Sequence, residues 1–394
     1  MRRHKHSLSH YRLLTADMGK LIPIACMEAL PGDTFQQATS LLLRMSPLQS
    51  PVMHPVTVRV HHWFVPNRLL WDDWEDFITG GPDGTGPATP YPSNTAPGSI
   101  AIGTVGDYLG LPTGVTFPAG ALALMPFRGY NLIFNEWYRD EDLVTEAGED
   151  DGDIRQIAWE KDYFTRARPW AQKGPDVTLP LGGTADVVGD GTAPSFIDTL
   201  STAQNLQTTA GFATTNFSGN MLATGAANWG DPHLQADLST ATATNIRDVR
   251  LAFALQRYQE ARAQYGSRYT EYLRYLGIRP SDARLQRPEY LGGGKQTVAF
   301  SEVLRTGNDQ ATATADEPVG QLLGHGIAAL RSNRYRYFCE EHGYVYTLLS
   351  VRPRTMYQDG LPRSWSRRTK EDYYQRELEL IGQQEIKNSE IFAD

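Results

Sequence analysis

Apolar and polar side chains alternate along several segments of this 394-residue chain. In the clearest of them, Pro55–Pro66, Val56, Val58 and Val60 alternate with polar residues, which is the period of a β-strand. Extended segments broken at Pro31-Gly32 precede it, and long aromatic and β-branched segments follow in the last third, at 297–304, 325–332, 334–341 and 343–353. Strands this far apart, with other elements between them, predict a mainly β, antiparallel sandwich with Greek-key or jelly-roll connections.

Apolar residues recur at helical spacing in three places between the predicted strands. Leu70, Trp74 and Phe77 predict a short helix directly after the strand that ends at Pro66. A second helical passage is predicted around Tyr130–Tyr138. The spacing over 246–276 fits one long helix or two helices joined near Gly266. These helices are expected as insertions between the strands of a single domain.

The chain divides by composition into an arm, a domain and an insertion. Residues 1–19 are basic and have no hydrophobic periodicity, so we interpret them as an N-terminal arm. Residues 20–394 are expected to form one domain. Within it, residues 175–244 are dominated by Gly, Ala, Thr, Ser and Asn, which predicts an insertion displayed on the surface.

Bulk composition narrows the class of protein. Hydrophobic residues make up 40% of the chain and charged residues 21%, which predicts a packed core rather than disorder. A formal charge of -8 argues against coating nucleic acid over the whole surface, although a local basic face stays open. Cys26 and Cys339 lack zinc-site spacing and are expected to be buried, reduced thiols. No apolar run predicts a membrane span or a signal peptide, so we expect the protein to be made and used in a cytoplasm.

Candidate sites for metals and catalysis are weak. His61 and His62 are adjacent on a strand and face opposite sides, which favours packing or a subunit contact over a shared metal ion. The acidic run from Asp140 to Asp153 lacks the calcium-loop order, so a solvated loop is favoured over a calcium site. The glycine-rich stretches do not match a phosphate-binding loop, because no Gly-Lys-Ser/Thr stands at the start of a predicted helix, and no nucleophile motif is present. We therefore predict no catalytic residues, no metal and no cofactor.

Two basic tracts remain as candidates for binding nucleic acid. One is the arm and the other is the C-terminal segment 352–386, where cations interleave with aromatic rings. Cations neutralise phosphates and rings stack on unpaired bases, a combination suited to single-stranded nucleic acid. An ordinary solvated surface with Arg–carboxylate contacts is an equal alternative. The candidate residues are Arg2, Arg3, Lys5, Arg12, Arg363, Trp365, Arg367, Arg368, Lys370, Tyr373 and Tyr374.

Three segments resemble the major capsid proteins of the Microviridae, tailless phages with circular single-stranded DNA, and in particular their gokushovirus-like members. They are the start MRRHKHSLSHYRLLTADMGKLIPI, the block VRVHHWFVPNRLLWDDWEDFITGG at 58–81, and the block at 352–386 that begins RPRTMYQDGLPRSWSRRTKEDYYQRE. The resemblance implies an eight-stranded jelly-roll capsid domain with large insertions. It further implies a T=1 icosahedral shell, located in the virion and assembled in the host bacterial cytoplasm.

The same resemblance implies a set of partners. They are further copies of the chain, the single-stranded DNA genome, other virion proteins such as a pilot and a scaffolding protein, and a receptor on the host-cell surface. Two other hypotheses stay open at this point. One is a single-stranded-DNA-binding protein that does not assemble, and the other is a carbohydrate hydrolase with two carboxylates of the acidic run fixed across a cleft.

Overall fold

The computed structural model describes residues 4–48, 52–81, 84–178, 246–304, 322–379 and 384–392, together with five short strands between 186 and 237. By its internal contacts the chain divides into two compact units. The first unit consists of residues 1–171 and 262–394, and the second consists of residues 172–261.

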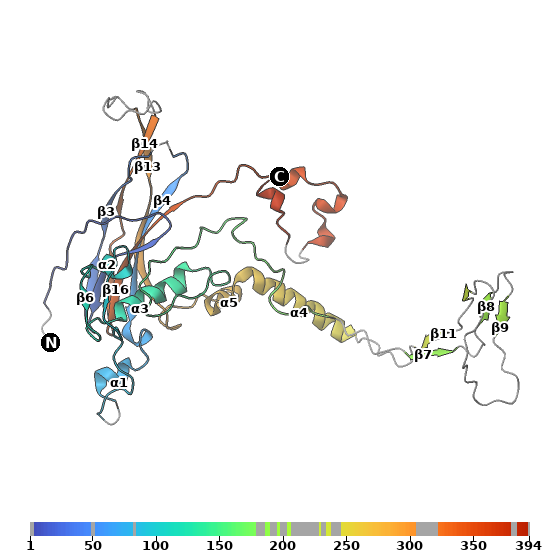
Figure 1. Ribbon diagram of the computed structural model, residues 1–394, viewed down its shortest axis with the longest axis horizontal. Coiled ribbons are helices and arrows are strands. Elements are labelled where there is room, and N and C mark those ends of the chain that lie inside the picture. The colour runs from blue at the N-terminus through green and yellow to red at the C-terminus, as the bar shows by residue number, and fades with distance from the viewer. Residues whose placement is uncertain are drawn as a thin grey trace. The chain divides into compact units, whose positions relative to one another are not determined.

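The first unit is built around an antiparallel sheet of four strands (Figure 1). Their order is β1 (Leu21–Ala29), β16 (Gly343–Pro353), β4 (Val56–Pro66) and β12 (Glu289–Thr297). The two central strands pair without interruption from Gly343 opposite Pro66 to Pro353 opposite Val56. The first and last strands of this unit therefore lie side by side, although more than 300 residues separate them.

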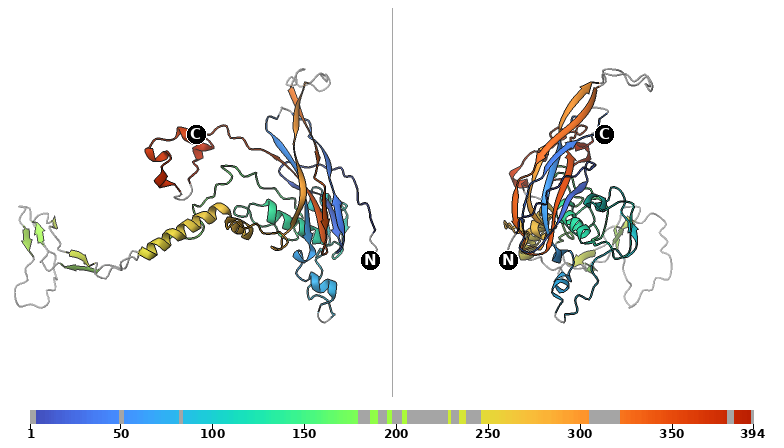
Figure 2. Two further views of the ribbon diagram at one scale, coloured as in Figure 1. Left: turned by 180° about the vertical axis from the view of Figure 1, so that it is seen from behind. Right: turned by 90° about the vertical axis from the view of Figure 1, so that its left-hand side faces the viewer.

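A second set of antiparallel strands covers one face of this sheet. It comprises β13 (Ala299–Leu304), β14 (Leu322–Arg331) and β3 (Ser40–Arg44), and beyond them β15 (Tyr335–Phe338) paired with β2 (Thr34–Gln37). Val58, Val60 and Leu349 point from the four-stranded sheet into a shared core with Ala328 and Leu330 of β14. Burying each of the larger aliphatic side chains contributes about 1.5–3 kcal/mol. The two layers form a sandwich, which Figure 2 shows edge-on.

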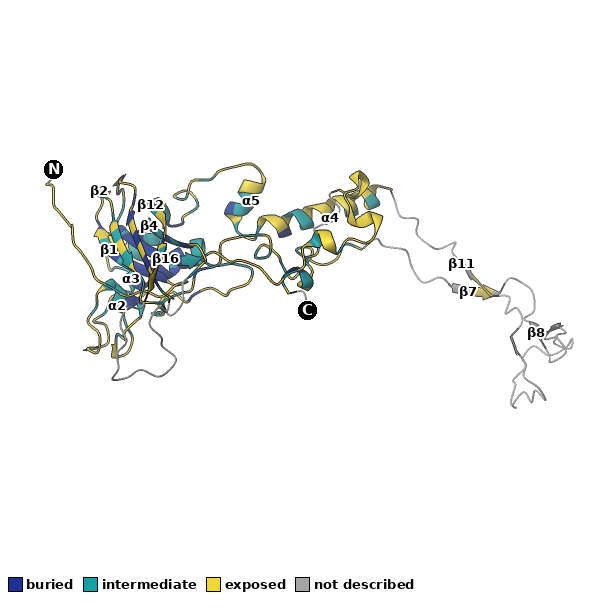
Figure 3. Cartoon of the chain, turned by 90° about the horizontal axis from the view of Figure 1, so that it is seen from above, coloured by how far each residue is buried: buried dark blue, intermediate teal, exposed yellow. Residues whose placement is uncertain are grey.

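Helices cover the other face of the four-stranded sheet. α2 (Val105–Leu109), α3 (Met125–Ile133) and the π-helical turn Phe134–Tyr138 pack on Trp63 and Leu348. The buried Tyr130 hydroxyl ties this layer to β1, because it donates to the Leu21 carbonyl at 2.8 Å and accepts the Arg155 N–H at 3.0 Å. Both faces of the sheet are thus covered, which explains why β16 is buried almost continuously (Figure 3).

The remaining elements of the first unit are short. A 3-10 turn (Asn67–Leu69) and α1 (Trp74–Thr79) follow β4, and β5 (Gly98–Ser99) pairs with β6 (Thr116–Phe117). α5 (Tyr269–Tyr275) is separated at Gly266, whose φ is 104°, from the longer α4 (Ile246–Tyr265), and residues 246–261 of α4 belong to the second unit. The C-terminal segment holds four 3-10 turns: Arg363–Trp365, Lys370–Asp372, Arg376–Leu378 and Asn388–Glu390.

In the second unit only short strand pairs are described before α4. β7 (Asp186–Gly189) pairs with β11 (Leu234–Asp237). β8 (Ser195–Ile197) pairs with β9 (Ala203–Asn205) and β10 (Asn228–Trp229). Most of the predicted insertion at 175–244 lies outside the described residues.

The prediction of a mainly β, antiparallel fold with few helices is confirmed. The predicted helix after Pro66 is split, since a 3-10 turn precedes α1. The break near Gly266 was one of the two predicted arrangements. Cys339 is buried and Cys26 is partly buried, and both are free thiols whose pKa is raised to about 12 by burial. No helix among the described residues is long and apolar enough to cross a membrane.

Candidate nucleic-acid interface

The C-terminal segment leaves the sandwich after β16 and closes on itself. Leu361 N–H donates to the Ser389 carbonyl at 2.7 Å, and the Arg363 guanidinium donates to the Glu385 carbonyl at 2.6 Å. Arg363 also reaches the buried carboxylate of Glu390 at 3.4 Å. These contacts pin the two ends of residues 360–392 together, and we call this segment the C-terminal loop. Arg363, predicted to bind DNA, is therefore occupied in closing the loop.

The aromatic side chains predicted in this segment are exposed. Trp365 is 78% exposed, Tyr374 75% and Tyr373 55%. The Arg367 guanidinium lies 5.3 Å from the centre of the Tyr373 ring, a cation–π arrangement. The Tyr374 hydroxyl donates to Glu379 at 2.9 Å, which leaves the face of its ring open. Exposed rings beside cations have the geometry that stacks on unpaired bases.

The charge of the C-terminal tract is more balanced than its arginines suggest. Residues 352–386 hold seven Lys and Arg against six Asp and Glu. Asp372 accepts the backbone N–H groups of Arg368 at 2.9 Å and Thr369 at 2.8 Å, and these bonds lower its pKa to about 2. Lys370 lies 3.6 Å from Glu371. Within the described residues, Arg367 and Arg368 are the predicted cations of this loop that form no ion pair.

In the arm, Arg12 contacts the sandwich domain, and its predicted role in DNA binding stays a prediction. The Arg12 guanidinium donates to the Tyr108 carbonyl at 2.5 Å and to the Ile24 carbonyl at 3.3 Å. A cation suits this position, because the last carbonyls of α2 carry partial negative charge. Arg12 thus ties the arm to the sandwich through two carbonyls, while the residue itself stays exposed. Lys5 is exposed, and Arg2 and Arg3 lie outside the described residues.

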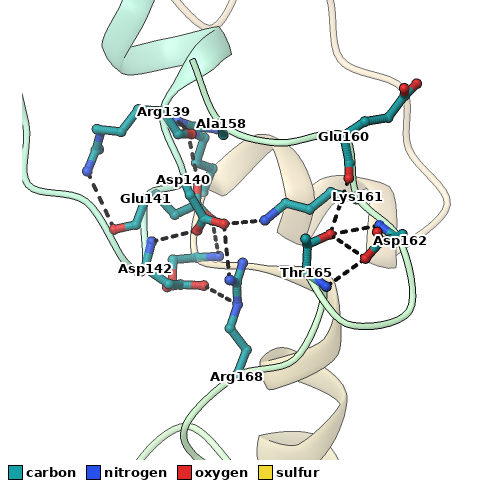
Figure 4. A network of polar contacts seen from close by, with 12 residues as sticks. Arg139, Asp140, Glu141, Asp142, Ala158, Glu160, Lys161, Asp162, Thr165 and Arg168 are labelled. Carbon is teal, nitrogen blue, oxygen red and sulfur yellow. Dashed lines mark hydrogen bonds and ion pairs between the residues drawn. The ribbon is translucent and has the colours of Figure 1, made fainter. Parts of the chain in front are cut away.

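The first three residues of the acidic run do not lie in the solvated loop that the sequence predicted. Asp140 is paired with Lys161 and, at 3.2 Å, with Arg168 (Figure 4). Asp142 meets the same Arg168 at 3.3 Å, and Glu141 meets Arg268 at 2.9 Å. The side chains of Asp140, Glu141 and Asp142 are 10%, 9% and 7% exposed. Burial opposes the ionisation of Asp140, but the hydrogen bonds and charges of Lys161 and Arg168 outweigh it and lower the pKa of Asp140.

Glu149, Asp150 and Asp151 of the acidic run are also paired with cations. Arg128 joins Asp150 at 2.6 Å and Glu149 at 3.3 Å, and Arg155 pairs with Asp151. Carboxylates committed to arginines are unavailable as an acid and base across a cleft, which removes the basis of the hydrolase hypothesis. Across the described part of the chain, no group of His, Cys, Asp and Glu is arranged to hold a metal ion.

The two adjacent histidines face opposite sides of β4, as predicted. His61 contacts the Tyr138 hydroxyl at 2.7 Å on the helical side. His62 is buried on the sandwich side, 3.0 Å from Thr347 and 3.1 Å from Ser332. Burial lowers the pKa of each to about 4, so both are neutral packing residues at pH 7.

One charged contact had no signal in the sequence. The carboxyl group of Glu271 hydrogen-bonds the carboxyl group of Glu141, 130 positions earlier. Burial, then the hydrogen bond to Glu141 and its charge, raises the pKa of Glu271 to about 7. The hydrogen bonds from Glu271 and from Ser267 N–H lower the pKa of Glu141 against the effect of burial. The two groups therefore share a proton near neutral pH.

Comparisons with known proteins agree on one family. A family model described as capsid protein (F protein) matches residues 1–394. The capsid protein VP1 of Bdellovibrio phage phiMH2K is 35% identical over 398 residues, which cover 95% of this chain and 73% of the relative. VP1 of Chlamydia phage 1 is 32% identical over 471 residues, covering 100% and 78%. VP1 of Spiroplasma virus 4 is 31% identical over 430 residues, covering 99% and 77%.

Proposed function

This chain belongs to the capsid protein (F protein) family of the Microviridae, and from that premise we propose that its copies assemble into a T=1 icosahedral shell around a circular single-stranded DNA phage genome. The match over the whole length of the chain is the observation that carries the proposal. A capsid family implies a structural, non-enzymatic role and a place in the virion.

The strand order supports a jelly roll as the capsid domain. In the sheet β1-β16-β4-β12, the last strand of the sandwich lies between its first strand, β1, and its fourth, β4, so the chain cannot follow a simple up-and-down path. Return connections of this kind are Greek-key connections, and two Greek keys make a jelly roll of eight strands. We propose that β2 and β3, with β14 and β15, belong to its second sheet.

Exposed apolar side chains support association between copies. A monomeric protein leaves single apolar residues on its surface, whereas an interface accounts for many large ones. Several in the first unit are far more exposed than a core residue would be: Tyr11 91%, Leu13 92%, Leu42 65%, Met53 83% and Ile102 87%. In a shell, each copy would bury such residues against its neighbours.

The C-terminal loop is the proposed contact with DNA. Arg367 and Arg368 would neutralise phosphates, and Trp365 and Tyr374 would stack on bases without sequence preference. Lys370 and Tyr373 complete this surface, and exposed Lys5 of the arm, with Arg2 and Arg3, would add charge. Because ion release drives such contacts, the proposed binding weakens as salt rises.

The wider setting follows from the family and is part of the proposal. Assembly would take place in the cytoplasm of a host bacterium, with a scaffolding protein and a pilot protein as partners. The finished particle would meet a receptor on the host surface.

The DNA contact is tested with Arg367→Ala, Arg368→Ala and Lys370→Ala combined in one variant. Particles purified from infected or co-expressing cells are expected to form in normal yield but to hold less nuclease-protected DNA. A matched variant with Arg279→Ala and Arg284→Ala, two exposed arginines outside the loop, should hold the wild-type amount. Failure of the triple variant to form particles would place these residues in a subunit interface. DNA binding by wild type that never forms a shell would favour the non-assembling DNA-binding alternative.

A further inference from the structure

The second layer of the sandwich has an outer face that nothing in the first unit covers. Along β14 the side chains alternate, so that Ala328 and Leu330 are buried while Ile327, Ala329 and Arg331 are exposed. Exposed and partly buried side chains also alternate along β3, where Leu42 is 65% exposed and lies on the same side as Arg44. The register places Ile327 opposite Arg44 and Ala329 opposite Leu42, so these residues share the outer face.

Among the described residues, the outward strand positions of this face carry basic residues. Its strands bring Arg44, Arg331 and Arg336 to the outside, and Arg334 lies in the turn between β14 and β15. None of these four arginines forms an ion pair with a described residue, and Arg334 donates to the Gln36 amide oxygen at 2.6 Å. The outward positions of β2, β3, β13, β14 and β15 include no Asp or Glu. We call this surface the arginine face.

α1 carries the opposite charge. Asp72, Glu75 and Asp76 are exposed at this helix and form no ion pair with a described residue, while Asp73 accepts a hydrogen bond from Thr89. The sequence holds no Lys or Arg from residue 69 to residue 127. Beside these acids, the apolar Phe77 and Ile78 are 43% and 49% exposed. We call residues 72–78 the acidic tip.

Resting on the proposed shell, we propose that the acidic tip of one copy docks on the arginine face of a second copy. The two surfaces are complementary in charge, and each also offers exposed apolar groups, with Phe77 and Ile78 on one and Leu42 and Ile327 on the other. Opposite charges brought together in this way align two partners and speed their association.

The chemistry of the arginine face favours a protein partner over DNA. Single-stranded DNA binds where several aromatic rings are open for stacking, whereas the residues beside these arginines are mainly the aliphatic Leu42, Ile327 and Ala329, with Phe338 as one exposed ring. A sugar-phosphate backbone would leave these apolar groups in water. A contact between two different surfaces of identical chains is heterologous, and it closes into a ring when the rotation allows. Rings about a symmetry axis are what an icosahedral shell requires.

A charge-exchange experiment tests the docking. The face variant combines Arg44→Glu, Arg331→Glu and Arg336→Glu. The tip variant combines Asp72→Arg, Glu75→Arg and Asp76→Arg. A control changes three exposed arginines elsewhere that form no ion pair with a described residue: Arg166→Glu, Arg279→Glu and Arg284→Glu.

Each protein is purified, its thermal unfolding is compared with wild type, and its assembly is followed by light scattering and electron microscopy. The face variant and the tip variant should each form at least roughly tenfold fewer shells, since like charges then oppose each other. The variant with all six changes should recover assembly, and the control should assemble as wild type does.

Three outcomes would overturn the docking. If all variants fold but the variant with all six changes assembles no better than the face variant or the tip variant, the two surfaces do not meet. If the face variant forms normal shells that lack DNA, the arginine face binds the genome instead. If the tip variant forms shells in wild-type yield, the acidic tip is not part of a contact. A wild-type protein that does not assemble at all would refute the proposed function itself, which keeps the two failures distinct.

Discussion

The shared proton between Glu141 and Glu271 makes the stability of the subunit depend on pH. Glu141 accepts Ser267 N–H at 2.7 Å and lies 2.9 Å from the Arg268 Nε, and Glu271 accepts Arg268 N–H at 3.2 Å. Asp142, paired with Arg168, is the nearest further carboxylate. The pair therefore joins the segment after α3 to the start of α5. Replacing Glu271 by Gln keeps a donor to Glu141 and removes the titration.

The sign of the effect follows from the raised pKa of Glu271. In the folded chain the pKa of Glu271 is about 7, and in the unfolded chain it is near its ordinary value of 4.5. The folded state therefore holds a proton that the unfolded state releases, so the stability is present below the unfolded value and is lost as pH rises toward 7. The lowered pKa of Glu141 has the opposite effect. It stabilises the folded state above the pKa of Glu141 in the unfolded chain, and this stability is lost as pH falls below that pKa.

The size of this change in stability is set by the difference between the pKa of Glu271 in the folded chain and in the unfolded chain. A shift in pKa from 4.5 to about 7 corresponds to about 3–4 kcal/mol at most, at about 1.4 kcal/mol per unit. Partial exposure of the pair reduces this to about 1–2 kcal/mol. Wild type should therefore lose about 1–2 kcal/mol of unfolding free energy between pH 5 and pH 8, relative to Glu271→Gln.

Urea unfolding of the dissociated subunit at pH 5, 6, 7 and 8 measures this difference. The two proteins should be similar in stability at pH 5, and the Gln variant should be the more stable at pH 8. Glu302→Gln, at an exposed position, serves as the matched control and should follow wild type at every pH. A stability gap between wild type and Glu271→Gln that stays constant from pH 5 to pH 8 would refute the shared proton.

Three further predictions concern single side chains. Gly129→Ala should destabilise the subunit by about 1–3 kcal/mol in urea unfolding, because the new Cβ would lie 2.2 Å from the buried Tyr346 hydroxyl; wild-type stability would show that the helix shifts freely. Arg12→Met should speed thermolysin cleavage of the first 14 residues several-fold, because the arm loses its bonds to Tyr108 and Ile24; an unchanged rate would mean that the arm is held by other contacts. Trp365→Ala should weaken binding of a single-stranded oligonucleotide by roughly tenfold in a fluorescence titration, whereas an unchanged affinity would exclude stacking at this ring.

Local patterns were enough to predict most of the individual elements. The alternation over Pro55–Pro66 gave β4, and the aromatic and β-branched segment at 343–353 gave β16, because a strand in a sheet must segregate its faces. The sequence left open one long helix or two helices joined near Gly266, and the chain adopts the second arrangement, with a φ of 104° at Gly266 that is accessible to glycine. The opposite orientations of His61 and His62 followed from the same two-residue period.

Pairings between distant segments could not be predicted in the same way. Nothing in the sequence indicates that Glu141 meets Glu271 or that Arg12 reaches the end of α2, because such contacts depend on the path of the whole chain. The acidic run was interpreted as a solvated loop for this reason, since its arginine partners lie elsewhere in the sequence. The arginine face was also hidden, because its residues alternate with apolar ones on separate strands.

The measurement that tests the central claim most directly is electron microscopy of the purified protein, combined with a mass measurement of single particles. The account predicts closed spherical shells of one size, with a protein mass of about 2.6 MDa for sixty copies of the 43.9 kDa chain. Particles that stay at the mass of one chain under every assembly condition, with no shells in the micrographs, would contradict it.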